Sequence, residues 1–187
     1  ERAGQKVERL SSEPIGVFVG NDGHDYEQLV HEHLQQKPNS PLLPYSASGN
    51  IISSAAGRLA YTFGFTGPTV TIDTACSSSL VAIHQACNSI RLGECQMAIA
   101  GGVKLHLTPQ SYIFTSRTGM ISPDGLCKTF DISADGYGRG EGCGMIVLKP
   151  LSQAQADGDK ILALIRGSAI NQDGPRSGLT VTNGQSQ

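Results

Sequence analysis

The segment from Thr69 to Leu80 constrains the fold of this chain more than any other part of the sequence. Its first residues, as far as Asp73, alternate β-branched side chains and predict a short buried strand. The next six residues are small, and beyond them apolar residues recur at the spacing of one helix face. These are Leu80, Ile83, Cys87 and Ile90. The segment therefore predicts a strand that turns sharply into a helix, with Cys76 at the turn.

The position of Cys76 favours a nucleophile over an ordinary buried residue. Backbone N–H groups at the start of a helix have no intrahelical partner, and the helix dipole stabilises negative charge there. A helix start therefore favours the thiolate, which is the reactive form of cysteine. A free cysteine is often only a part of the core, but the small residues around Cys76 leave room for a substrate above the turn.

Composition argues against several classes of function. The net charge of the 187 residues is −2, which provides no basic surface for nucleic acid or an anionic membrane. The sequence contains no long apolar run that predicts a membrane span, and no signal peptide is visible at its start. The five cysteines are odd in number and include no C-x-x-C pair. A disulfide scaffold or a zinc ribbon is therefore not expected, and a reducing, cytoplasmic setting is favoured.

Strands and helices are expected to alternate along a single domain. Further strands are expected at residues 15–19, 97–100, 145–148 and 161–165, the last two as a pair. Further helices are expected at residues 25–33, from residue 48 or 50 to 63, at 109–114 and at 152–157. Pro38, Pro41 and Pro44 predict an extended connection between the first two of these helices. Apolar strands of this kind suit a sheet that is covered on both faces, so the predicted fold class is α/β.

The stretch from Gly136 to Gly144 has the composition of a phosphate-binding loop without its pattern. No register gives G-x-G-x-x-G, and no P-loop occurs elsewhere. The glycines are expected to allow close backbone packing at the end of a long functional loop that begins with a turn at residues 122–125. Asp131 and Asp135 are expected to stabilise turns in that loop.

No histidine lies in a motif that supports a role as the base for Cys76. His84 is eight residues farther along the predicted helix, about 12 Å from the helix start, which is too far for a hydrogen bond to the thiol. We interpret His106 as a polar residue at the end of a strand, and His24 as part of a turn. His31 and His33 point apart on a helix, so no metal site is expected there.

Several further motifs accompany the Cys76 segment. With Thr74-Ala-Cys-Ser-Ser-Ser-Leu80 these are Gly101-Gly-Val103, Met120-Ile-Ser-Pro-Asp-Gly125, Cys127-Lys-Thr-Phe-Asp131, Ala134-Asp-Gly-Tyr-Gly-Arg-Gly-Glu-Gly142 and Gly167-Ser-Ala-Ile-Asn-Gln-Asp-Gly174. In this combination, which covers most of its length, the chain resembles the β-ketoacyl synthase (ketosynthase) domain of modular type I polyketide synthases.

The resemblance implies a thiolase-like layered α/β fold, of which residues 1–187 form a part. This part is the nucleophile-bearing N-terminal half with adjoining segments, without the start of the domain and without its C-terminal half. The resemblance implies that Cys76 accepts an acyl chain from an acyl carrier protein as a thioester. A malonyl-type extender then loses carbon dioxide and attacks the thioester in a decarboxylative Claisen condensation. The amide of Cys76 is expected to stabilise the thioester oxygen.

The resemblance also implies a homodimer in a cytoplasmic synthase, with an acyl carrier protein as partner. Substrates arrive on its phosphopantetheine arm, so no directly bound cofactor, no cofactor-binding residue and no metal-binding residue are expected. Residues 45–53 are expected near the acyl pocket of the dimer partner, and Lys128 near the entrance for the carrier protein. The family uses two histidines that follow its cysteine, whereas here none follows His106. Residues 1–187 alone are therefore expected not to condense substrates.

Two alternatives to this interpretation stay open. One is a β-ketoacyl synthase of the fatty-acid type, because the sequence motifs do not separate the two types sharply. The other is a non-condensing ketosynthase-like domain that binds acyl chains or holds a dimer together.

Overall fold

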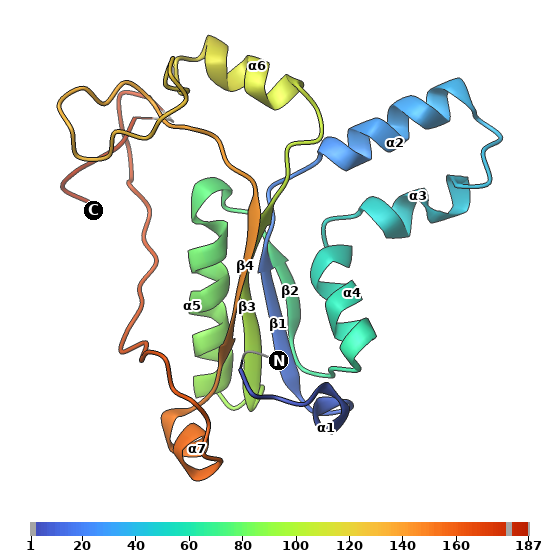
Figure 1. The fold of residues 1–187 in the computed structure, drawn as a ribbon, viewed down its shortest axis with the longest axis vertical. Coiled ribbons are helices and arrows are strands. Elements are labelled where there is room, and N and C mark those ends of the chain that lie inside the picture. Colours follow the sequence, from blue (N-terminus) through green and yellow to red (C-terminus); the bar gives the residue numbers. More distant parts are fainter. Residues whose placement is uncertain (1–2, 179–180, 187) are drawn as a thin grey trace.

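The structure, a computed structural model, describes residues 3–178 and 181–186. Within these residues four strands form one sheet: β1 (Ile15–Gly20), β2 (Thr69–Ile72), β3 (Met97–Lys104) and β4 (Gly142–Leu148). The strand order is β2-β1-β3-β4. The first three strands are parallel, and β4 runs antiparallel to β3. The carboxyl ends of the parallel strands lie at the top of the sheet in Figure 1.

Helices cover both faces of this sheet, which confirms the expected α/β class. Helix α5 (Ser78–Arg91) packs on β1 and β3, while α4 (Ser54–Phe63) packs against β1 and β2 from the opposite side (Figure 1). The other helices are α1 (Val7–Leu10), α2 (Asp25–Gln36), α3 (Leu43–Asn50), α6 (Gln110–Arg117) and α7 (Leu151–Ala156). No helix of the described residues is long and apolar enough to span a membrane.

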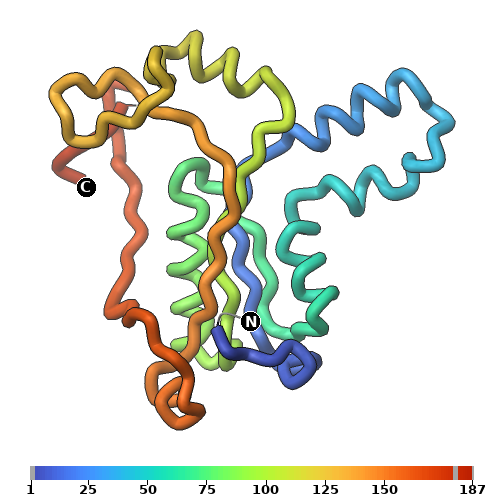
Figure 2. Tube along the Cα trace, in the orientation of Figure 1, coloured from blue at the N-terminus to red at the C-terminus, as the bar shows by residue number. Residues whose placement is uncertain are grey.

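The path of the chain leaves the two ends of the sheet with different neighbours. Helix α6 lies beyond the carboxyl ends of the parallel strands, and α7 lies near the opposite end (Figure 2). After α7 the chain returns along the outer side of α5 as an extended segment without helix or strand (Figure 2).

Strand β1 is the centre of the core because both of its faces are buried. Ile15, Val17 and Val19 pack with residues of α4 on one face. Phe18 packs on the other face against Ala82 of α5 and its neighbours. This two-sided burial explains why the strand is a continuous apolar run rather than an alternating one.

Two glycines allow the first turn of α5 to approach the carboxyl edge of the sheet. A Cβ on Gly20 would lie 2.6 Å from main-chain atoms of Ser78 and Ser79, and a Cβ on Gly102 would lie 2.8 Å from the Cβ of Ser79. The buried residues of α5 are correspondingly small: Ser78, Ala82, Ala86, Cys87 and Ser89. The expectation that Leu80 faces the core is therefore wrong, since Leu80 is 71 % exposed.

The expected extended connection after α2 is only partly present. Pro44 lies in the first turn of α3, where proline is tolerated because the first N–H groups of a helix have no intrahelical acceptor. The helix predicted from Ser48 or Asn50 to Phe63 begins later, because α3 ends at Asn50 and α4 begins only at Ser54.

Three strand predictions also need correction. Strand β2 is not buried but lies at the edge of the sheet, where Val70 is 42 % exposed. Strand β3 does not end at Ala100 but continues through the two glycines to Lys104. Residues 161–165 form no strand and do not pair with β4, whose partner among the described strands is β3.

Replacement of Gly20 by alanine is expected to lower the free energy of unfolding by about 1–3 kcal/mol, because the added methyl group meets the main chain of α5. The matched control is Gly57→Ala in α4, where an added Cβ meets no atom within 4 Å. That change is expected to be neutral or to stabilise the helix by up to about 1 kcal/mol. Urea unfolding followed by circular dichroism measures both, and equal midpoints would contradict the expectation.

Candidate active site

The turn between β2 and α5 is strained immediately before Cys76. Ala75 has a φ of +55°, in the left-handed region that residues other than glycine rarely adopt. Its N–H donates to Oδ1 of Asp73 at 3.0 Å, and its carbonyl accepts the hydroxyl of Ser78 at 2.7 Å. The same hydroxyl accepts the N–H of Thr74 at 2.8 Å. Such strain persists only where neighbouring contacts hold it, and it is concentrated at functional sites.

Cys76 lies at the start of a helix, as the sequence predicts. It is the middle residue of a short 3₁₀ turn, Ala75–Ser77, that leads directly into α5. The N–H groups at such a start have no acceptor within the helix. Cys76, Cys127 and Cys143 are exposed, whereas Cys87 and Cys95 are buried. Exposure and position fit a nucleophile, and the catalytic role of Cys76 stays a prediction.

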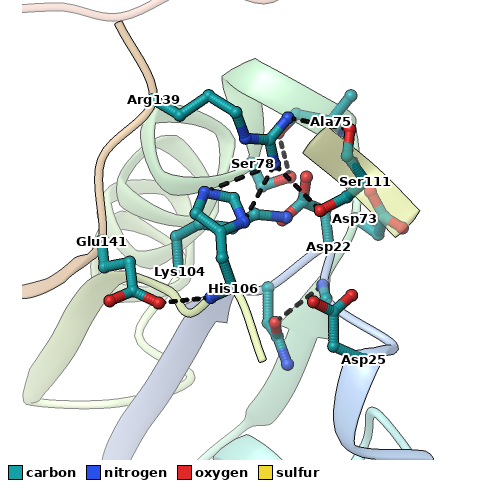
Figure 3. A network of polar contacts seen from close by, with 12 residues as sticks. Asp22, Asp25, Asp73, Ala75, Ser78, Lys104, His106, Ser111, Arg139 and Glu141 are labelled. Atoms are coloured by element: carbon teal, nitrogen blue, oxygen red, sulfur yellow. Dashed lines mark hydrogen bonds and ion pairs between the residues drawn. The ribbon is translucent and has the colours of Figure 1, made fainter. Parts of the chain in front are cut away.

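A second group of polar residues follows the carboxyl ends of β1 and β3 (Figure 3). Lys104 and Asp22 form an ion pair of 2.8 Å, with each side chain about one third exposed. Asp25 accepts the N–H groups of Leu107 and Thr108 at 3.0 and 3.1 Å. Burial raises the pKa of Asp25, but these hydrogen bonds outweigh it, so its pKa lies below the ordinary value.

His106 is held by two residues that the sequence analysis did not single out. Arg139 donates to its ring at 2.9 Å, and Glu141 accepts its backbone N–H. The ring also meets Tyr112 edge-on, with the centroids 5.2 Å apart. The expectation that His106 follows a strand is confirmed, because β3 ends at Lys104. The sequence feature that could have identified Arg139 and Glu141 is their position as charged residues between closely spaced glycines.

His84 binds one residue of α5 and one residue of the extended segment that follows α7. Its Nδ1 lies 2.9 Å from the hydroxyl of Ser168, and its Nε2 lies 2.8 Å from Nδ2 of Asn88. Both ring nitrogens therefore have partners other than Cys76, in line with the expectation that His84 is not its base. In the described part of the chain no three His, Cys, Asp or Glu side chains are grouped as metal ligands.

The long loop after α6 is fixed by an ionic cluster around Lys128. Lys128 contacts Asp124 at 2.9 Å and Asp135 at 2.7 Å. The hydroxyl of Ser122 donates to Asp124 and lies 2.7 Å from Asp135. Hydrogen bonds from Ser122 and Lys128 lower the pKa of Asp124 to about 2. Asp131 accepts the N–H of Ser133 at 2.8 Å. The expectation that Asp131 and Asp135 stabilise this loop is confirmed.

Glycines in this loop permit the close backbone packing that the sequence predicts. A Cβ on Gly138 would lie 2.1 Å from the carbonyl oxygen of Gly125, and one on Gly136 would lie 2.4 Å from the nitrogen of Ser122. The loop is thus folded back on itself at two points, and Ile121 forms an isolated bridge with Tyr137.

The sheet with helices on both faces is that of a thiolase-like α/β fold. Residues 1–154 match the family described as "Beta-ketoacyl synthase, N-terminal domain". The chain belongs to the β-ketoacyl synthase family. Its full length is 51 % identical to part of a phenolphthiocerol/phthiocerol polyketide synthase of Mycobacterium tuberculosis, and it spans 8 % of that protein. It is 46 % identical to a segment of an erythronolide synthase of Saccharopolyspora erythraea and spans 5 % of it.

Solved ketosynthase structures resemble the chain. A ketosynthase from module 6 of the bacillaene synthase of Bacillus subtilis superposes with a TM-score of 0.87 at 41 % sequence identity. The match covers 98 % of this chain and 30 % of that ketosynthase. The sequence-based interpretation as part of a thiolase-like ketosynthase is therefore confirmed.

Replacing Ser122 by alanine is expected to raise the pKa of Asp124 from about 2 toward its ordinary value of 3.8, because the hydrogen bond from Ser122 is the largest cause of the shift. Lys128→Met is also expected to raise it, because Lys128 lowers this pKa through its hydrogen bond and through its charge. The pKa of Asp131 serves as the internal control, because Ser133 lowers it independently. Carboxyl NMR titration measures both.

Because the pKa of Asp124 is depressed, its contribution to loop stability is complete above the ordinary pKa and is lost as the pH falls toward 2. An unchanged titration of Asp124 in the Ser122→Ala variant would show that the hydroxyl does not hold this carboxylate.

Cys76 is expected to be alkylated fastest of the five cysteines, because it is exposed and lies at a helix start. Cys143 is the internal control for exposure alone, and Cys87 and Cys95 are the controls for burial. Iodoacetamide labelling followed by peptide mass spectrometry gives the rate at each site. Equal rates at the three exposed thiols would contradict an activated Cys76.

Proposed function

We propose that this chain provides the acyl-accepting part of a polyketide-synthase ketosynthase, with Cys76 as the nucleophile. The observation that carries the proposal is the exposure of Cys76 on a strained turn at the start of a helix. Family membership supports it, since relatives from Mycobacterium tuberculosis and Streptomyces halstedii that match over the whole chain are named as polyketide synthases. Those names favour the polyketide type over the fatty-acid type.

The acylation step transfers an acyl group from one sulfur to another. The Cys76 thiolate attacks the carbonyl carbon of a thioester on the phosphopantetheine arm of an acyl carrier protein. The tetrahedral intermediate expels the carrier thiolate, so one C–S bond forms and one breaks without any change in oxidation state. The backbone N–H of Cys76 is the donor that we assign to the developing oxyanion.

The second half-reaction joins carbon to carbon. A malonyl-type extender on a carrier protein loses carbon dioxide, and the resulting carbanion attacks the Cys76 thioester and releases the β-ketoacyl product. Groups that stabilise the enolate oxygen and the departing carboxylate are needed for this step. His84 and His106 bind Ser168 and Arg139 instead. We therefore assign acyl transfer, not decarboxylation, to residues 1–187.

Three further features belong to this proposal. The activity corresponds to that of a 3-oxoacyl-[acyl-carrier-protein] synthase, an acyltransferase that binds no cofactor directly and takes its substrates from phosphopantetheine. The working form is a homodimer in the cytoplasm, with an acyl carrier protein as partner and without contact to nucleic acid or membrane. The inability of residues 1–187 alone to form a carbon–carbon bond stays a prediction.

Incubation of the polypeptide that carries this sequence with an acyl-loaded carrier protein is expected to add one acyl mass to Cys76, because a thioester forms there. Cys76→Ala is expected to abolish this acylation, whereas Cys127→Ser, a change at another exposed thiol, is expected to retain it. Intact-protein and peptide mass spectrometry locate the acyl group. Acylation that persists in Cys76→Ala would refute the assignment of the nucleophile.

A further inference from the structure

We infer that Arg139 is a positioning residue that holds α6 at the carboxyl end of the sheet, where acyl chains reach Cys76. The inference rests on the proposed function, because it concerns delivery of the acyl group. In this role Arg139 does not contact the reacting atoms. Its basis is the unusual way in which α6 is attached to the molecule.

Helix α6 is not held by an apolar face. Thr115 is its only buried residue, and Tyr112, Ile113 and Phe114 are 42 %, 49 % and 63 % exposed. No described helix or strand packs extensively against it. A helix with so little buried apolar surface gains little from packing, so its position depends on polar contacts.

Arg139 supplies most of these polar contacts. Its guanidinium donates to Oγ1 of Thr115 at 3.0 Å and to the hydroxyl of Ser111 at 3.4 Å. It lies over the Tyr112 ring, 4.8 Å from the centroid. The one buried side chain of α6 is thus also an acceptor for Arg139. The planar guanidinium group binds residues on two successive turns of the helix. It therefore fixes the rotation of α6 about its own axis as well as the distance between α6 and Arg139.

The same guanidinium attaches α6 to the end of β3. Arg139 donates to the ring of His106, which requires an unprotonated ring nitrogen as the acceptor. Glu141, two residues along the chain, accepts the His106 N–H, and Asp25 accepts the N–H groups of Leu107 and Thr108. The connection from β3 to α6 is therefore held from two sides (Figure 3). Arg139 joins it to the helix by hydrogen bonds, beside the edge-on contact between the rings of His106 and Tyr112.

The position of α6 matters because of where the sheet ends. Gly102 of β3 and Gly20 of β1 contact the first turn of α5 at Ser78 and Ser79. The turn with Cys76 thus lies at the same end of the sheet as α6 (Figure 1). A small reagent reaches an exposed thiol without help from α6. An acyl chain on a carrier arm must be aligned there, and misplacement by about 1 Å is enough to slow a reaction by about 100-fold.

The test compares acyl transfer with alkylation in the full polypeptide that carries this sequence. In R139M the rate constant for acyl transfer from a loaded carrier protein to Cys76 is expected to fall by about 10- to 100-fold. Iodoacetamide alkylation of Cys76 is expected to stay within about twofold of the unsubstituted rate, because the turn itself is unchanged. R139K is expected to lose most of the transfer rate, since an ammonium group lacks the fork.

The matched control is R117M, which removes an exposed arginine from the same helix and is expected to leave both rates unchanged. T115V removes one acceptor of Arg139 and is expected to reduce acyl transfer less than R139M does. If R139M does not fold, T115V decides the question in the same assay. Transfer equal to that of the unsubstituted protein would overturn the inference. A parallel loss of transfer and alkylation would also overturn it, as evidence of a merely structural role.

Hydrogen exchange separates this inference from the proposed function. Amides of residues 110–117 are expected to exchange faster in R139M, while those of α5 are expected to keep their protection. Unchanged exchange in α6 would overturn the positioning role even if Cys76 is acylated. Absence of acylation in the unsubstituted protein would overturn the proposed function, whatever the exchange of α6 shows.

Discussion

The closeness of α5 to the carboxyl edge of the sheet determines where every other part of the site lies. At Gly20 and Gly102 a side chain as small as a methyl group would meet α5, so the helix begins in contact with the ends of two strands. The contact selects small residues along the buried face of α5, such as Ala82 and Ala86. A helix fixed in this way has its N-terminus at the edge of the sheet rather than above its face. In open α/β sheets this edge is where ligands bind.

The strain at Ala75 is a consequence of the same contact. Strand β2 ends at Ile72, opposite Gly20, and α5 begins only six residues later at Ser78. The chain must reverse its direction within this distance, and the left-handed conformation of Ala75 accomplishes much of the reversal. Ser78 joins the turn to the helix by binding both Thr74 and Ala75. Cys76 is then exposed because the backbone leaves it no position inside the core.

Local patterns in the sequence were sufficient for the parts of this arrangement that depend on neighbouring residues. The helix start at Cys76, the turn at residues 122–125 and the α/β class follow from spacing and turn chemistry. Properties that depend on the partner of an element were not predicted. Leu80 has the spacing of the predicted face, and Ile83 and Ile90 of that face do pack on the core, but the first turn of α5 contacts the sheet through Ser78 and leaves Leu80 exposed. The sequence of β2 looks like that of an inner strand, although its place at the edge depends on the strand order. Arg139 was missed because its acceptors lie up to 33 residues away.

The two halves of the structure are stabilised by different kinds of interaction. The sheet, α4 and α5 share a dry core centred on β1. Beyond the carboxyl edge, α6 and the loop to Gly142 are held by ion pairs and hydrogen bonds around Lys128 and Arg139. Polar contacts fix these segments without burying the apolar side chains of α6, which stay exposed. The position of α6 therefore depends on the polar contacts of Arg139, because Thr115 is the one buried residue of this helix.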